Sequence, residues 1–352
     1  MDCTYSKKKQ AKSFKRAASA RSCTVGLFML ISTVFSSVAS RTYYSVLGKN
    51  EETVSRAVGD FFASVFGISR IEGAVIAKNV LYSGISDELF SMLSMLACLF
   101  LPAYFAGRIW KKSVSDCFVT DGKLVKGLVF IYAFSQLVMF SMTSISDGIF
   151  GFLFPGNESF SGTQTAIPIT NDIFTIIISF LCTCIMVPII EEYVFRGVVY
   201  RIFEDIGTSF AVVASALCFG LMHSSPSQCM YAIAFGLFSA VFVAVTGNIK
   251  TSILFHMINN TVSSMTLLLS EFLPEKSAVM IDIIYILYVF SFSFYGMYLF
   301  FSKNGILYKF REKCLEIDGK REFQAGLLHF LSVPVLIFIL LFSLTAALGT
   351  VL

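Results

Sequence analysis

Charged residues are scarce in this chain. Only 14% of its 352 residues are Asp, Glu, Lys or Arg, whereas 56% are hydrophobic. A soluble globule needs more polar surface than such a composition supplies, so that class is excluded. The formal net charge of +4 is small, and Lys and Arg gather in a few short connections rather than over one face. This distribution argues against nucleic-acid binding. The composition predicts a polytopic helical membrane protein.

Several sequence patterns of known sites are also missing. The nine cysteines show neither a disulfide framework nor zinc-knuckle spacing, and most lie inside apolar runs, where a thiol behaves as a small hydrophobic group. Cys182 and Cys184 would point to nearly opposite faces of a helix, which argues against a metal pair. The chain has three histidines but no His-Glu-x-x-His motif and no serine nucleophile elbow. These absences exclude the usual zincin helix and the serine-hydrolase turn.

Long apolar runs are abundant. A helix needs roughly 20 mainly apolar residues to cross the hydrocarbon core of a bilayer. The runs predict an all-α polytopic bundle of about eight to nine spanning helices, at 25–39, 89–106, 127–144, 173–199, 209–223, 229–245, 252–270, 279–301 and 327–351.

Basic residues fall in alternate connections of this predicted bundle. Residues 1–24 form a basic arm, residues 108–126 carry five Lys or Arg, and residues 303–321 carry six, whereas residues 145–171 carry none. Because cytoplasmic connections are enriched in Lys and Arg, we expect the arm to be cytoplasmic and residues 145–171 to be external. Nine spans would place the C-terminus outside. The short loops and the basic inner side are typical of a bacterial cell membrane.

Two N-terminal segments each admit two interpretations. The first span follows a basic region and ends in small residues, so it is either an anchor, which we favour, or a cleaved signal peptide. The external stretch after it has apolar residues at helical spacing, namely Val54, Val58, Phe61, Phe62, Val65 and Phe66. That spacing predicts an amphipathic helix on the bilayer surface or, equally, a small packed cap.

Three polar clusters interrupt the apolar second half of the chain. An ionisable side chain near the centre of a spanning helix costs about 2.5 to 3.5 kcal/mol, so such residues usually have a function. A single cluster would more often be a structural clamp or contact between helices. Three clusters at one depth favour a catalytic site. They are Glu191-Glu192 with Arg196, Phe219 with His223, and His256 with Asn260.

Helix geometry predicts how these clusters meet. Glu191 and His223 are equally far in sequence from a turn at Gly207, so antiparallel helices would bring them to similar depth. Glu192 and Arg196 are four residues apart and can form an ion pair, while Glu191 projects about 100° away towards a cavity. His256 and Asn260 share a face in the same way.

The neighbours of His223 also have expected roles. Phe219 lies one helical turn before His223 and can pack beneath its imidazole. Gly220 lets a neighbouring helix approach closely.

This combination of groups favours hydrolysis of an amide bond. A desolvated carboxylate beside an imidazole suits activation of water, and an amide with a second imidazole can stabilise an oxyanion. The alternative is a zinc site in which His223, His256 and Glu191 or Glu192 bind the metal and a water completes the shell. Spacing alone does not separate the two. His329 lies outside every motif and is interpreted as a membrane-interface residue.

The ordered motifs Glu-Glu-x-x-x-Arg, Phe-x-x-x-His and His-x-x-x-Asn resemble the CPBP intramembrane proteases, over about 173–270. This family includes type II CAAX prenyl endopeptidases and bacteriocin-immunity relatives. The resemblance implies a glutamate-dependent endopeptidase, with zinc as the alternative cofactor. It implies that Glu191 and His223 activate water, that His256 and Asn260 stabilise the oxyanion, and that Glu192, Arg196 and Phe219 support the site.

The resemblance also divides the chain and suggests its partners. We expect a basic arm at 1–24, membrane helices with the external segment at 25–170, the catalytic core at 171–270 and C-terminal membrane helices at 271–352. The expected substrate is a membrane-associated peptide or lipidated protein, with a CAAX protein the less favoured case. The competing hypothesis is a non-proteolytic scaffold or immunity protein that binds a partner through the same cluster. A transporter is disfavoured because the sequence shows no inverted repeat.

Overall fold

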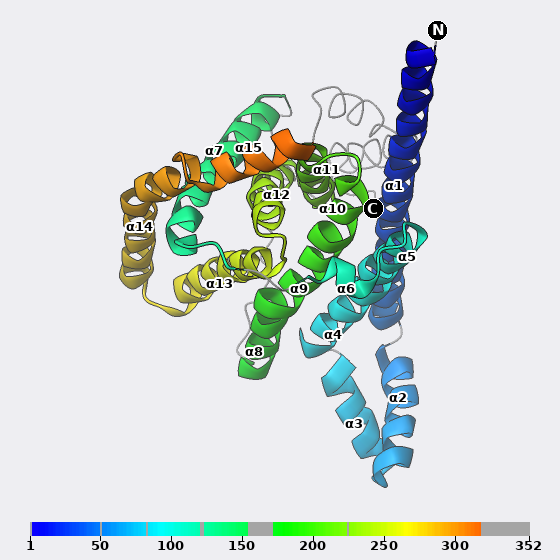
Figure 1. Cartoon of the computed structure of the whole chain (residues 1–352). Coiled ribbons are helices and arrows are strands. Elements are labelled where there is room, and N and C mark those ends of the chain that lie inside the picture. Colours follow the sequence, from blue (N-terminus) through cyan, green and yellow to red (C-terminus); the bar gives the residue numbers. More distant parts are fainter. Residues whose placement is uncertain are drawn as a thin grey trace.

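The computed structural model describes residues 2–49, 51–81, 84–119, 123–153, 172–223 and 225–317, and within these ranges it contains helices and no strands (Figure 1). In chain order the helices are α1 (Asp2–Lys49), α2 (Glu51–Phe66), α3 (Arg70–Leu81), α4 (Gly84–Ser94), η1 (Met95–Phe100), α5 (Leu101–Ile109), α6 (Val114–Cys117), α7 (Leu128–Leu153), α8 (Ile173–Leu181), η3 (Cys182–Met186), α9 (Val187–Glu192), η4 (Tyr193–Val199), α10 (Tyr200–Glu204), α11 (Thr208–Leu221), α12 (Pro226–Thr246), α13 (Lys250–Phe272), α14 (Glu275–Phe301) and α15 (Ile306–Ile317). The segments η1, η3 and η4 are π-helical.

Six stretches of the described chain are long and apolar enough to cross a membrane. They are Arg16–Gly48, Ser86–Ile109, Leu128–Leu153, Ile173–Glu204, Pro226–Thr246 and Glu275–Cys314. The predicted all-α polytopic bundle is confirmed. Two further predicted spans are helices outside this set: α11 is shorter, with 14 residues, and α13 carries the polar third motif. The ninth predicted span and His329 lie outside the described residues.

The segment with the amphipathic pattern forms a packed hairpin. Helix α2 lies along α3, away from the main bundle (Figure 1). Their backbones approach closely at Gly59, where an added Cβ would lie 2.5 Å from the Cα of Ala74. The predicted helix is present and packs against a second one, and its contact with the bilayer surface stays a prediction. The side chains of Phe61 and Phe66 remain exposed on it.

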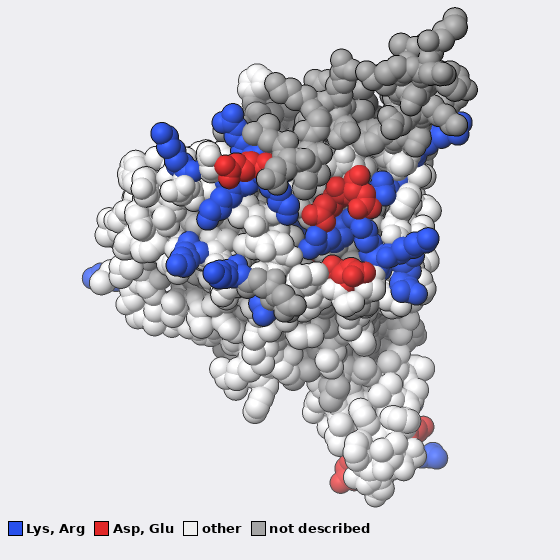
Figure 2. Space-filling view, in the orientation of Figure 1, with Lys and Arg blue, Asp and Glu red and all other residues white. Residues whose placement is uncertain are grey.

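Charged side chains gather in a band at one level of the bundle, and a second small group lies on the tip of the α2–α3 hairpin (Figure 2). Ion pairs tie α1 to the core: Asp205, directly after α10, lies 2.9 Å from Arg21 and 3.3 Å from Lys112. The Arg21 guanidinium also lies 4.8 Å from the ring centre of Trp110. A charged band beside a broad uncharged surface is the pattern of an integral membrane protein.

Two glycines allow α11 and α12 to pack closely. A Cβ on Gly220 would lie 2.8 Å from the carbonyl oxygen of Cys229, and one on Gly236 would lie 3.0 Å from the Cα of Ala216. The predicted close approach at Gly220 is confirmed. The contact brings the second motif, at the end of α11, against α12.

Two turns set the directions of the helices that carry the motifs. Gly207 lies between α10 and α11, as the sequence predicts. Gly247 ends α12 with φ +73°, a left-handed conformation that glycine adopts without the Cβ penalty. Helix α13 therefore starts three residues later and returns into the bundle towards α9.

Candidate active site

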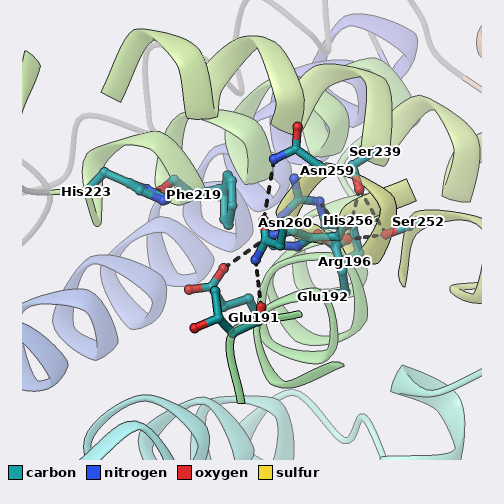
Figure 3. A network of polar contacts seen from close by, with 11 residues as sticks. Glu191, Glu192, Arg196, Phe219, His223, Ser239, Ser252, His256, Asn259 and Asn260 are labelled. Carbon is teal, nitrogen blue, oxygen red and sulfur yellow. Dashed lines mark hydrogen bonds and ion pairs between the residues drawn. The ribbon is translucent and has the colours of Figure 1, made fainter. Parts of the chain in front are cut away.

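The three motifs meet where α9, η4, α11, α12 and α13 pack together (Figure 3). The carboxylates stand at the end of α9, the guanidinium in η4, one imidazole directly after α11, and the other imidazole with its neighbouring amides in α13. The residues of this cluster are Glu191, Glu192, Arg196, Phe219, His223, Ser239, Ser252, His256, Asn259 and Asn260.

Glu192 and Arg196 form a fully buried ion pair. The side chains of both residues have no exposed surface, and Arg196 Nε lies 3.3 Å from Glu192 Oε2. The guanidinium carbon also lies 4.4 Å from the ring centre of Phe219 and 5.9 Å from that of Phe235. These ring faces stabilise the cation in place of water. The predicted ion pair between Glu192 and Arg196, four residues apart, is confirmed, although Arg196 lies in the π-helical segment η4.

The Glu192 carboxylate has further partners on α12 and α13. Ser239 Oγ donates to Oε2 at 2.9 Å, and Ser252 donates to the same oxygen. The other oxygen, Oε1, lies 3.0 Å from His256 Nδ1. The two serines are fully buried and are absent from the sequence motifs. A single serine in an apolar helix gives no signal that would have identified either one.

The contact with Glu192 indicates which nitrogen of the His256 ring donates. A carboxylate can only accept, so the ring nitrogen Nδ1 carries the hydrogen that it donates to Glu192. The other nitrogen, Nε2, lies 3.7 Å from Glu191 Oε2. Glu191 is 17% exposed, whereas the side chain of Glu192 is fully buried. One carboxylate is thus held inside while its neighbour faces outwards, as the helix geometry predicts.

His223 is held separately. Its Nδ1 lies 2.9 Å from the Phe219 carbonyl oxygen, which only accepts, so Nδ1 carries a hydrogen and Nε2 is left as an acceptor. The Phe219 ring lies edge-on to both imidazoles, with centroid distances of 4.9 Å to His223 and 5.8 Å to His256. The Phe219 ring therefore contacts both imidazoles. Its contact with His223 is the one that the sequence predicts. Within the described chain, Glu191 makes its ion-pair contact with His256 rather than with His223.

Two hydrogen bonds hold the side-chain amide of Asn260. Its Nδ2 donates to the Thr183 carbonyl oxygen at 2.9 Å, and its Oδ1 accepts a longer hydrogen bond, 3.4 Å, from Asn259 Nδ2. Asn259 in turn accepts from Gln136 and Tyr231. The sequence motifs include Asn260 but not Asn259.

Burial divides the cluster into two parts. Glu192, Arg196 and His256 are buried, whereas Glu191, His223 and Asn260 are partly exposed. The partly exposed groups are the ones that a substrate could reach. The buried groups can act only through their contacts with these partly exposed groups.

The proposed zinc ligands do not form a metal cluster as they are arranged. Among the described residues, no group of three or more His, Cys, Asp or Glu side chains is placed to hold a metal ion. Each imidazole has its Nδ1 engaged, His223 with a carbonyl and His256 with Glu192. A metal-bound histidine holds its second nitrogen in the same way, so these bonds do not count against a metal. The zinc alternative stays a prediction that a metal analysis can test.

Comparisons with known proteins cover the same region. Residues 173–262 match the family model described as type II CAAX prenyl endopeptidase Rce1-like. A Bacillus subtilis (strain 168) protein named "Putative membrane peptidase YdiL" is 25% identical over 189 residues, which is 52% of this chain and 72% of that protein. No solved structure matches the chain.

The matched segment contains all of the motif residues, from Glu191 in α9 to Asn260 in α13. By contrast, Gln136 in α7 lies outside it. The family resemblance drawn from the three motifs is confirmed. Over residues 173–262, this integral membrane protein is similar to the Rce1-like type II CAAX prenyl endopeptidases.

Proposed function

We propose that the protein is an intramembrane endopeptidase that hydrolyses a peptide bond of a membrane-associated peptide or protein, with Glu191 as the base that activates water. One observation carries the proposal. Glu191 is a partly exposed carboxylate 3.7 Å from an imidazole whose other nitrogen is held by the buried Glu192. The family match over residues 173–262 supports the same activity.

The groups present account for each proton in the reaction. Glu191 takes a proton from water, and the hydroxide adds to the carbonyl carbon of the peptide. His223 Nε2, left as an acceptor, provides a second contact for that water. The protonated Glu191 then gives its proton to the departing amine nitrogen as the carbon–nitrogen bond breaks. The products are a carboxylic acid and an amine.

The oxyanion would be stabilised by His256 and Asn260. His256 Nε2 lies 3.7 Å from Glu191 Oε2 and would donate to the oxyanion when it carries a hydrogen. Asn260 Nδ2 uses one hydrogen for the Thr183 carbonyl, and its second hydrogen provides the other donor.

The setting suits a substrate that arrives through the membrane. The matched segment includes the apolar span Ile173–Glu204, and the partly exposed residues of the site lie on that span and its neighbours. Substrates of this kind are membrane-associated peptides and lipidated proteins. A bacterial cell membrane with a cytoplasmic N-terminus fits the distribution of basic residues.

Substitutions test the peptidase against the scaffold hypothesis. Purified wild type, Glu191→Gln and His223→Ala would be reconstituted in vesicles with a panel of acylated and prenylated fluorescence-quenched peptides. We expect both variants to lose at least about 100-fold in kcat while inserting normally, as loss of a positioned base requires. Glu88→Gln, in another span, is the matched control and should cleave normally. Undiminished cleavage by Glu191→Gln would contradict the mechanism.

Metal analysis of the same preparation tests the zinc alternative. For a glutamate-type peptidase, we expect cleavage to persist after chelation and zinc to be well below one equivalent. Activity that disappears with a chelator and returns with zinc would favour the metal-dependent subtype. A scaffold would retain its biological activity in the Glu191→Gln and His223→Ala variants.

A further inference from the structure

A chain of side-chain amides leads from outside the matched segment to Asn260. It starts at Tyr285 in α14, whose hydroxyl donates to Gln136 Oε1 in α7 at 3.1 Å. Gln136 Nε2 donates to Asn259 Oδ1 at 3.0 Å, and Tyr231 in α12 donates to the same oxygen at 2.7 Å. Asn259 Nδ2 then donates to Asn260 Oδ1. We call this set, with the Thr183 carbonyl, the amide relay.

The Thr183 carbonyl is available because of Pro188. In the π-helical segment η3 the Val187 amide donates to the Cys182 carbonyl, five residues back. The next amide in that register would serve Thr183, but it belongs to proline, which has no N–H. Asn260 Nδ2 donates to this carbonyl at 2.9 Å and so supplies the hydrogen bond that Pro188 cannot make.

This carbonyl sets the orientation of every amide in the relay. It can only accept, so Asn260 must turn its Nδ2 towards it and its Oδ1 towards Asn259. Asn259 must then present its Nδ2, which leaves its Oδ1 for Gln136 and Tyr231. Reversing any one amide would place two acceptors or two donors face to face.

We infer that Asn259 is a positioning residue for Asn260, held by Gln136 and Tyr231, and that the relay fixes the Asn260 amide for oxyanion stabilisation. The inference rests on the proposed peptidase activity. Gln136 and Asn259 are buried, whereas Asn260 is partly exposed. The relay thus approaches the site from the buried side of the bundle, and Asn260 is its member that would contact the substrate.

Asn259→Asp is the sharpest perturbation. Aspartate keeps the size of the side chain and an acceptor for Gln136 and Tyr231, but it replaces the donor to Asn260 with an oxygen. We expect kcat to fall about tenfold, the effect of one lost buried hydrogen bond, with KM changed by less than about twofold. Tyr231→Phe, which removes a single hydroxyl, is a milder second variant and should lower kcat by a smaller factor.

A double-mutant cycle separates positioning from general damage. Asn260→Ala alone should lower kcat by about 100-fold or more, as loss of an oxyanion donor does. Adding Asn259→Asp to it should cause no further loss, because the residue that Asn259 positions is already gone. Losses that multiply in an otherwise active enzyme would overturn the relay and leave the proposed function standing. A wild type that cleaves none of the peptides would overturn both.

The matched control uses two tyrosines of α14. Tyr285 donates to Gln136 within the relay, whereas the Tyr288 hydroxyl donates to the Val129 carbonyl oxygen at 2.6 Å, outside it. We expect Tyr285→Phe to lower kcat and Tyr288→Phe to leave it unchanged. Equal effects of the two substitutions would count against the relay.

Discussion

Replacing Glu192 with leucine would leave Arg196 as an unpaired cation inside the bundle. Both side chains are fully buried, and their closest nitrogen and oxygen are 3.3 Å apart. At an effective dielectric constant of about 20, Coulomb's law gives about 5 kcal/mol for this separation. Removing one partner of a buried ion pair costs about 3 to 5 kcal/mol, which agrees. We expect Glu192→Leu to lose stability in this range.

The double variant Glu192→Leu with Arg196→Met separates stability from activity. Replacing a buried ion pair by apolar residues of similar volume is often neutral or stabilising, so the double variant should recover most of the lost stability. It should still cleave poorly, because His256 has lost the carboxylate that holds its Nδ1. The assays are denaturant unfolding in mixed micelles and peptide cleavage in vesicles.

Two results would refute this reasoning. A double variant as unstable as Glu192→Leu would mean that the carboxylate is needed for reasons other than the charge of Arg196. A stable double variant with wild-type cleavage would mean that His256 needs no orienting carboxylate. Ser239→Ala is a milder variant whose loss of stability can be compared with that of Glu192→Leu. It removes one of the hydroxyl donors to Glu192 and keeps both charges. We expect it to cost about 1 kcal/mol.

Two further predictions concern packing and pH. Gly220→Ala should destabilise the protein by about 1 to 3 kcal/mol, because its Cβ would lie 2.8 Å from the Cys229 carbonyl oxygen. Gly148→Ala, with open space around it, is the helical control; equal losses in thermal stability would contradict the packing argument. Asp172 caps α8, and the Thr175 hydroxyl, followed by backbone amides of the first turn, lowers the pKa of its carboxyl below 3.8. A lowered folded-state pKa means that stability from the ionised cap is present above pH 3.8 and is lost as the pH falls through the folded value. The Tm difference between wild type and Asp172→Ala should therefore narrow in acid, and a constant difference would contradict the assignment.

Features encoded by local spacing could be predicted from the sequence. The Glu192–Arg196 pair follows from a separation of four residues, and the turn at Gly207 follows from a break between two apolar runs. The close approach at Gly220 follows from its missing side chain. Each of these three features depends on residues within one or two helical turns. Over so short a distance, a π-helical segment changes the directions of the side chains only slightly.

Features that depend on contacts between distant helices could not be predicted. Ser239 and Ser252 bind Glu192 only because α12 and α13 bring them there, and nothing in their own sequence marks them. The pairing of Glu191 with His256 depends on the relative tilt of α9 and α13. Pro188 is the exception, since a proline inside an apolar helix signals a carbonyl that needs another donor.

The adjacent carboxylates also bear on the rotation of the helix that carries them. Glu191 and Glu192 stand about 100° apart around the axis of α9. Turning that helix by one residue would bring Glu191 to the position of Glu192, against the serines of α12 and α13, and would carry Glu192 about a further 100° away from them. The apolar side chains around α9 would resist such a turn only weakly, because one aliphatic face packs much like another. The partners of Glu192 on two other helices discriminate between the two settings, so a costly buried charge selects a single rotational register for the whole span.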